Sequence, residues 1–341
     1  MNVTIAPLAE TLTPFLNTVK PTQLAVLVDE HTRRHCYPLV KPLLPKHALI
    51  SIKSGEAEKH LATCEHIWQT LTDAAFDRHA LLLNLGGGVI GDMGGFCAAT
   101  YKRGIAFAQL PTTLLAQVDA SVGGKLGIDF RGFKNHIGVF QVPQAVLIDP
   151  VFLQTLPARE LRSGFAEVVK HCLIADAAKW QQIRRRDLSQ QDWRDLIQHS
   201  VGIKQQITEA DPTEKGRRKI LNFGHTLGHA IETYFLSEPK KRLLHGEAIA
   251  LGMLAESYLS YRRGNLDRTA LGQIEEFLFA IYGKVALAKS DFEGIIALTR
   301  QDKKNRGGQV RFALLDGLGQ CTYDVPVTPR DMRAALAYYV G

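Results

Sequence analysis

Four side chains with metal-binding chemistry are spread over three segments of this 341-residue chain. His225 and His229 are four residues apart in LNFGHTLGHAIE, a spacing that places both on one face of a helix. His245 follows in LLHGE, and Glu167 lies earlier in GFAEVVK, three residues before Lys170. Two histidines and one carboxylate leave a tetrahedral zinc ion one open position, which is typical of catalytic sites. The alternative is that the two neighbouring histidines form only a polar helix face.

The histidine segment is not the HExxH motif of a metalloprotease. Thr226 stands where that motif has its general base. Several charged or polar side chains precede this segment in a stretch with helical periodicity, and they add charge near the histidines. They are Lys204, Glu214, Arg218 and Asn222.

A glycine-rich turn follows the apolar run ALLLNL. Gly86, Gly88 and Gly91 satisfy G-x-G-x-x-G, in which glycines admit a diphosphate to the N-terminus of a helix. The acidic residue that usually follows about 20 positions later is missing, because no Asp or Glu occurs between Asp92 and Asp119. The pattern indicates a dinucleotide or phosphate turn in an unusual position, or a tight turn without a ligand.

A second polar stretch covers residues 111–140. Thr112 and Thr113 offer hydroxyl groups, and Gly123-Gly124 precede Lys125. A Gly-Gly-Lys turn presents free amides and a positive charge, which suit a phosphate group. The same composition would also suit a solvated loop.

The elements that carry these motifs differ between the two halves of the chain. Apolar runs separated by helical segments predict a parallel sheet with helices on both faces. The runs are residues 24–28, 80–85, 105–110 and 145–149, with a helix at 56–71. From Arg159 onward the periodicity is helical, with an apolar helix at 248–258 and a hairpin or loop at 309–321. We predict a Rossmann-like α/β nucleotide-binding domain over residues 1–155 and an all-α metal-binding domain over residues 156–341.

The composition is that of a globular protein, with 45% hydrophobic and 22% charged residues. The formal charge of +7 suits small anionic substrates. We expect no nucleic-acid partner, because no RNP, KH or zinc-finger pattern occurs. Five scattered cysteines without a CxxC pair argue against a disulfide framework and a thiolate zinc site. No run approaches the ~18–20 apolar residues of a membrane span, and MNVTIAPLAE lacks the features of a signal peptide, so we expect a cytoplasmic protein without a membrane partner.

Seven segments, in family order between about residue 80 and residue 255, resemble motifs of the 3-dehydroquinate synthase family. They are GGGVIGDMGGF, ATYKRGI, QLPTTLLAQVDASVGGKLGID, KNHIGVF, GFAEVVK, LNFGHTLGHAIE and LHGEAIALGM. Each segment alone is a weak sign of this family, but the seven together are highly specific to it. The resemblance implies a homodimer whose subunits have an NAD-binding α/β domain, a helical domain and a site between them. It also implies NAD that is used without being consumed and one divalent metal, zinc or cobalt and normally zinc.

The same resemblance implies that Glu167, His225 and His245 are the metal ligands. It implies NAD contacts from Asp29, Glu56, Lys59, Gly87, Gly88, Asp92, Thr112, Thr113, Lys134 and Thr155. Asp29, at the end of an earlier strand, would replace the acid missing after the glycine turn. Two segments depart from the family's pattern: Asp29-Glu30-His31 ends in histidine, and GEAEK has Glu58 where serine is common.

The implied substrate contacts are basic, amide and acidic side chains. They are Arg103, Asp119, Lys125, Asn135, Lys170, Lys204, Arg218, Asn222, His229 and one of Lys303 or Lys304, of which we select Lys304. Catalytic roles would fall to Lys125, Lys170, Lys204, Glu214, Arg218 and His229. Of these, Glu214 and His229 match positions with acid or base functions. Arg103 is expected to reach the neighbouring site across the dimer.

The family's substrate is 3-deoxy-D-arabino-heptulosonate 7-phosphate, whose two anionic ends suit a pocket rich in Lys and Arg. By resemblance, NAD takes a hydride from C5 of the metal-bound substrate, phosphate is eliminated, the hydride returns, and aldol closure gives 3-dehydroquinate. This is a step of the shikimate pathway toward aromatic amino acids. Rival functions are a sugar phosphate cyclase that forms a valiolone or an inosose, a metal-dependent alcohol dehydrogenase of similar fold, and an inactive binding protein.

Overall fold

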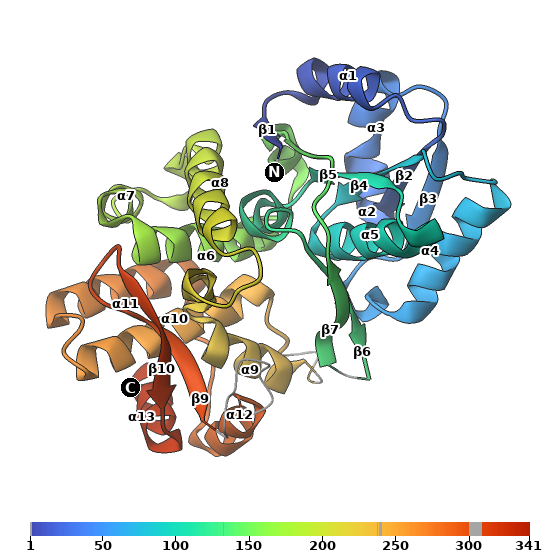
Figure 1. Cartoon of the computed structure of the whole chain (residues 1–341). Helices are drawn as coiled ribbons and strands as arrows, with labels where there is room; N and C mark the ends of the chain where they lie inside the picture. The colour runs from blue at the N-terminus through green and yellow to red at the C-terminus, as the bar shows by residue number, and fades with distance from the viewer. Residues whose placement is uncertain (1, 132, 237, 239–240, 300–308) are drawn as a thin grey trace. The chain divides into compact units, whose positions relative to one another are not determined.

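The computed structural model describes residues 2–131, 133–236, 238, 241–299 and 309–341. The chain forms two compact units (Figure 1). The first unit runs to Leu161 and also includes Trp193–Gln205. The second unit comprises Arg162–Asp192 and the chain from Gln206 onward. The boundary between residues 155 and 156 stays a prediction.

The first unit is built on a six-stranded sheet in the order β1-β8-β5-β4-β2-β3. The strands are β1 (Val3–Ile5), β2 (Leu24–Asp29), β3 (Ala48–Ile52), β4 (Leu81–Gly86), β5 (Ala106–Pro111) and β8 (Ala145–Ile148). All neighbouring pairs are parallel, which confirms the predicted sheet type. Four strands coincide with the four predicted apolar runs. These runs are continuous because the strands are buried on both faces.

Helices cover both faces of this sheet, as the side chains of β2 show. Ala25 and Leu27 belong to one hydrophobic core with residues of α4 and α5. Val26 and Val28 belong to another core with residues of α1. The helices of this part are α1 (Leu8–Val19), α2 (Glu30–His35), α3 (Tyr37–Val40), α4 (Leu61–Asp73) and α5 (Gly88–Thr100). The helix predicted at 56–71 is divided into a 3-10 turn, η2 (Glu56–Glu58), and α4, which begins after His60 because that side chain caps it.

The polar stretch at 111–140 contains a hairpin that was not predicted. β6 (Lys125–Phe130) pairs with β7 (Phe133–Phe140) in antiparallel register. Leu126 and Ile128 of β6 are buried in the core beneath α4 and α5. The side chains of β7 are mostly exposed, so this strand reads as a loop in the sequence.

The second unit is mainly helical, as predicted. The helices α6 (Ala158–Ala175) and α8 (Trp193–Ala210) contribute residues to both units. The remaining helices are α7 (Ala177–Ile183), α9 (His225–Phe235), α10 (His245–Arg262), α11 (Arg268–Tyr282), α12 (Phe292–Thr299) and α13 (Pro329–Val340). The helix predicted at 248–258 is the central part of α10. The hairpin or loop expected at 309–321 is an antiparallel hairpin of β9 (Val310–Leu315) and β10 (Cys321–Val327), so this unit is not purely α-helical.

Within the described ranges, no helix combines the length and the apolar character needed to cross a lipid bilayer.

Candidate functional site

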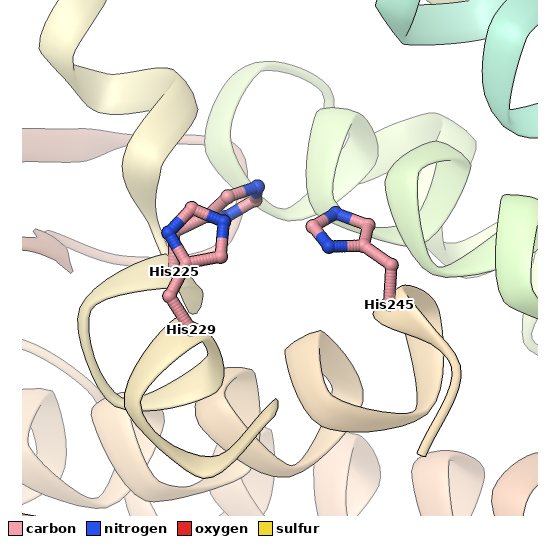
Figure 2. Close-up of side chains that lie close together, drawn as sticks. All are labelled: His225, His229 and His245. Atoms are coloured by element: carbon pink, nitrogen blue, oxygen red, sulfur yellow. The ribbon is translucent and has the colours of Figure 1, made fainter. Parts of the chain in front are cut away.

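Three imidazole rings meet where α9 and α10 begin (Figure 2). His225 is the first residue of α9, His229 lies one turn later, and His245 is the first residue of α10. One ring nitrogen from each histidine lies within 4.8 Å of those of the other two. His225 is buried and His245 half-buried, whereas His229 is exposed. The cluster can therefore be reached from the side of His229.

Glu167 of α6 completes the predicted ligand set. Its Oε1 lies 3.4 Å from Nε2 of His225 and 3.4 Å from Nε2 of His245. The structure thus brings together three residues from three different helices that were expected to share a metal ion. His229 joins them as a fourth side chain able to bind metal, where the resemblance implies proton transfer. The division of these roles stays a prediction.

Hydrogen bonds orient two of the rings so that their Nε2 atoms face Glu167. Nδ1 of His225 donates to the backbone oxygen of Phe223 at 2.9 Å. Nδ1 of His245 donates to Oε2 of Glu232 at 3.4 Å. Metal-binding histidines usually donate from their second nitrogen in this way, which fixes the tautomer that binds the metal. This arrangement of one buried carboxylate and two oriented rings fits a divalent cation such as zinc.

Lys170 provides the positive charge beside the carboxylate. Its Nζ forms an ion pair with Oε2 of Glu167, and both side chains are buried. Burial alone would raise the pKa of Glu167, but Lys170 and His225 hold the pKa of this carboxyl well below its usual range. Burial and Lys170 together lower the pKa of His225. At neutral pH, Glu167 is therefore ionised and the His225 ring is neutral, which are the forms that bind a metal.

His245 differs from His225 in its protonation. Burial alone would lower the pKa of His245, but the nearby carboxylates of Glu167 and Glu232 raise it to about 10. In the metal-free protein, Lys170 and protonated His245 therefore balance the charges of the two carboxylates. A divalent cation would replace the proton of His245.

Glu232 is a site residue that the sequence analysis missed. Its signal is present in the chain, because His225, His229 and Glu232 follow the spacing i, i+4 and i+7 of one helix face. A carboxylate on the same helix face as two candidate ligands is well placed to accept a hydrogen bond from a third ligand, here His245.

Three predicted substrate-binding or catalytic residues lie together before α9. Nδ2 of Asn222 donates to Oε1 of Glu214 at 2.7 Å. Arg218 is buried, and its Nη1 donates to the backbone oxygen of Pro212 at 2.7 Å. The amide of Asn222 and the carboxylate of Glu214 therefore hold each other in place.

In the first unit, the predicted nucleotide contacts lie at the carboxyl ends of adjacent strands. Asp29 ends β2, Gly87 and Gly88 follow β4, and Thr112 and Thr113 follow β5. α5 begins at Gly88, and within the described ranges no side chain caps its N-terminus. Open sheets of this kind bind nucleotides at this edge, with phosphate at such a helix start. The carboxylate of Asp29 caps α2 by accepting from N of Thr32 at 2.7 Å.

A second group of predicted NAD contacts surrounds Lys59. The buried Nζ of Lys59 lies 2.6 Å from Oδ2 of Asp92 and 2.6 Å from Oδ1 of Asn135. Burial alone would lower the pKa of Lys59, but Asp92 and Glu56 raise it, so the ammonium group is charged. Nζ of Lys134 lies 3.6 Å from Oε1 of Glu56. The structure therefore brings together four predicted NAD contacts and Asn135, a predicted substrate contact.

Two of the remaining predicted residues form an ion pair within the first unit. Nζ of Lys204 pairs with Oδ1 of Asp119 at 2.7 Å and contacts its backbone oxygen. Lys125 is the exposed first residue of β6, and Thr155 ends the 3-10 turn η5 (Pro150–Thr155). Arg103 is exposed, with a left-handed φ of 67°. Lys303 and Lys304 lie outside the described residues.

Two family models match this chain. The model described as 3-dehydroquinate synthase N-terminal matches residues 49–163, and the model described as 3-dehydroquinate synthase C-terminal matches residues 164–305. Among curated proteins, the 3-dehydroquinate synthase of Parabacteroides distasonis is 39% identical in an alignment of 334 residues that covers 96% of this chain and 94% of that protein.

Solved structures with the same fold include two synthases. The 2-epi-5-epi-valiolone synthase of Streptomyces hygroscopicus subsp. jinggangensis, with NAD+ and Zn2+ bound, is 28% identical and superposes with a TM-score of 0.88 over 99% of this chain and 96% of that chain. A 2-deoxy-scyllo-inosose synthase complexed with carbaglucose-6-phosphate, NAD+ and Co2+ is 23% identical, with a TM-score of 0.83 over 98% of this chain and 96% of that chain. The second similarity concerns the fold alone.

Fold and comparisons together define an enzyme of the sugar phosphate cyclase type, with a parallel six-stranded sheet in its first unit and a cluster of one carboxylate and three imidazoles in its second. Within that class, the chain belongs to the 3-dehydroquinate synthase family.

Proposed function

We propose that this chain converts 3-deoxy-D-arabino-heptulosonate 7-phosphate into 3-dehydroquinate and phosphate, as a step of the shikimate pathway. The observation that carries the proposal is that Glu167 lies next to His225 and His245 in a chain that matches both the N-terminal and the C-terminal model of the family. One buried carboxylate and two imidazoles from three separate helices meet at one point, as the ligands of a catalytic metal must.

The residues proposed to hold the two cofactors are those described above. Glu167, His225 and His245 would hold a divalent metal, and the residues around Gly87, Lys59 and Thr112 would hold NAD. When bound, the metal would polarise hydroxyl groups of the substrate and NAD would take up and return one hydride. Thr155 at the end of η5 is proposed as a further NAD contact.

The chain's own side chains would bind and orient the substrate. Lys125, Lys204 and Arg218 offer positive charges for the phosphate and carboxylate groups. Asp119 positions the ammonium of Lys204, and Glu214 positions the amide of Asn222. Lys170 would keep Glu167 ionised and oriented, so that its role is partly to prepare the metal site.

His229 is the proposed proton carrier at the metal centre. Its ring centre lies 5.0 Å from that of His225 and 5.7 Å from that of His245, and its side chain is exposed. It can therefore exchange protons with solvent and the substrate while the buried ligands stay in place. Glu214 is the second candidate for acid or base work.

We further propose a cytoplasmic homodimer in which Arg103 reaches the site of the neighbouring subunit. Arg103 is exposed, as this role requires. Phe133 and Phe140 of β7 are 47% and 60% exposed, so the hairpin offers apolar surface for a subunit contact. The five cysteines are free thiols, which fits a reducing compartment.

Sequence identity favours this substrate over those of related enzymes. The chain is 39% identical to a 3-dehydroquinate synthase and 28% identical to a valiolone synthase. A valiolone- or inosose-forming cyclase would act on a sugar phosphate without a carboxylate. A metal-dependent alcohol dehydrogenase would accumulate NADH, and a binding protein would leave all substrates unchanged.

The test is an assay of purified protein with NAD and zinc. We expect equal amounts of phosphate and 3-dehydroquinate from the heptulosonate phosphate, no net NADH, and loss of both products after chelation. Seven-carbon sugar phosphates lacking the carboxylate, and glucose 6-phosphate, serve as the comparison substrates. Phosphate release from one of these in preference to the heptulosonate phosphate would overturn the substrate assignment.

A further inference from the structure

The helix that carries two of the histidines has no capping side chain at its own N-cap. This position in α9 is Gly224, which has a left-handed φ of 78°. The first N–H groups of a helix have no acceptor within the helix and need one from elsewhere. Glu256 of α10 provides it: Oε2 accepts from N of Gly224 at 2.6 Å, and Oε1 accepts from N of Leu227 at 3.1 Å. His225 lies between these two anchored residues.

Glu256 is buried, so its carboxylate needs hydrogen-bond donors within the protein. Its side chain is fully buried, where an ionised carboxylate is unfavourable unless it is well paired. The positive end of the α9 dipole and two N–H groups stabilise the carboxylate there. The contact therefore stabilises both the carboxylate and the start of α9.

Glycines bring the two helices close enough for this contact. A Cβ atom at Gly252 of α10 would overlap the backbone oxygen of Gly224 and lie 2.7 Å from N of Gly228. A Cβ atom at Gly224 would lie 2.5 Å from Cγ of Met253. The backbones of α9 and α10 thus approach each other directly, one turn from Glu256.

The bracing between the two helices is reciprocal. Glu256 of α10 anchors the turn that contains His225, the first residue of α9. Glu232 of α9 accepts from Nδ1 of His245, the first residue of α10. Each helix therefore holds in place the first residue of the other, and both first residues aim Nε2 at Glu167.

We propose that Glu256 is a positioning residue of the metal centre, which holds His225 in the orientation for metal binding through the first turn of α9. This inference rests on the proposed function, because it presupposes that Glu167, His225 and His245 bind a metal. Glu256 itself does not touch the metal or the substrate in this role.

The test compares Glu256→Gln with Asp267→Ala in the full chain. Gln has nearly the same shape as Glu but replaces one acceptor oxygen with an NH₂ group that faces a backbone N–H. Asp267 is a matched control because its carboxylate caps α11, a helix without a proposed ligand, by accepting from N of Ala270 at 2.7 Å. Two measurements are made: zinc affinity by competition with a chelator, and the visible absorption spectrum of the cobalt-loaded protein.

We expect Glu256→Gln to bind zinc about 10–100-fold more weakly and to shift the cobalt bands, as for other residues that orient metal ligands. Asp267→Ala should lose thermal stability but keep the wild-type affinity and spectrum. Glu256→Asp, which keeps both oxygens, should restore part of the affinity.

Each other outcome contradicts a defined claim. If wild-type protein binds no zinc, the proposed metal site is wrong and the inference falls with it. If wild-type protein and Glu256→Gln bind zinc equally and share one cobalt spectrum, the metal site stands but the positioning role is wrong. If Glu256→Gln does not fold by circular dichroism, Glu256 is a general stability residue and the inference is also wrong.

Discussion

Oε1 of Glu167 lies 3.4 Å from Nε2 of His245, while an ion pair with Lys170 engages the other carboxylate oxygen. Glu167 is fully buried, so its charge must be balanced within the protein. The same carboxylate therefore serves the proposed metal centre and the stability of the metal-free protein. These two roles can be separated by experiment.

Glu167→Gln should abolish phosphate release and also destabilise the metal-free protein. The substitution removes a charged ligand and leaves the buried ammonium of Lys170 without its counter-charge. Breaking a buried ion pair typically costs about 3–5 kcal/mol. Urea denaturation of the chelated protein measures the change in the free energy of unfolding, and metal analysis measures the zinc content.

Glu293→Gln is the matched control for the loss of stability and of zinc expected from Glu167→Gln. Glu293 forms an ion pair with Arg333 at 2.6 Å, but the two side chains are 69% and 49% exposed. Exposed pairs contribute little to stability, so we expect no measurable change in unfolding or in zinc content. Equal stability of both variants would contradict the buried-pair account.

Zinc binding should release about one proton at pH 7. The pKa of His245 is raised to about 10 in the metal-free protein, whereas that of His225 is lowered. Only His245 therefore carries a proton that zinc must displace. Since this proton competes with zinc at every pH below the raised pKa, zinc affinity should increase roughly tenfold per pH unit between pH 6 and 8.

Calorimetry in buffers of different ionisation enthalpy measures the released proton directly. A wild-type affinity that is independent of pH would show that His245 is already neutral or does not bind the metal.

His229→Asn should separate proton transfer from metal binding. Of the three histidines His229 alone is exposed, and the resemblance assigns it an acid or base role. We expect wild-type zinc content and a fall in kcat of about 10²–10⁴, the usual contribution of such a group. Loss of zinc from this variant would instead make His229 a ligand.

Lys59→Met should weaken NAD binding without affecting zinc. Nζ of Lys59 joins Asp92 to Asn135 at 2.6 Å each, next to the glycine turn. Its removal leaves a carboxylate without its cation where a nucleotide is proposed to bind. We expect the Kd for NAD to rise about tenfold or more, which is ~1.4 kcal/mol. Lys219→Met removes a lysine paired with Asp324 at 2.6 Å, and should leave NAD affinity unchanged. Similar NAD affinities for the two variants would contradict the assignment of Lys59.

Gly252→Ala should destabilise the second unit. Its methyl group would overlap the backbone of α9, and overpacking of this kind costs about 1–3 kcal/mol or more. Gly272→Ala in α11 meets no atom within 4 Å, so the better helix propensity of alanine should stabilise the protein by up to about 1 kcal/mol. Thermal unfolding of the two variants should therefore shift in opposite directions. A common direction would show that α9 and α10 are not in direct backbone contact.

The parallel sheet could be predicted from the sequence because its central strands are buried on both faces. Continuous runs such as LAVLV in β2 carry that information by themselves. β1 and β3 were missed because both are short edge strands, and most of their residues are only partly buried. The β6–β7 hairpin was missed because one of its strands faces solvent, although Leu126 and Ile128 alternate as in a strand.

The site could be predicted only in part from residue spacing. The helical periodicity of His225 and His229 is visible in the chain, but no spacing rule brings Glu167 to His245. That contact depends on the packing of α6 against the starts of α9 and α10, and only the family resemblance anticipated it. Glu232 was not anticipated, although it shares a helix face with His225 and His229. Glu256 was not anticipated because it acts on the first residues of a different helix.

The central claim is that one carboxylate and two imidazoles from separate helices bind a single metal ion. Anomalous diffraction at the zinc edge from crystals of the zinc-loaded protein tests it most directly. The account predicts one peak about 2.0–2.2 Å from Oε1 of Glu167 and from Nε2 of both His225 and His245. A peak elsewhere, or fully loaded crystals in which these three atoms do not surround the metal, would contradict it.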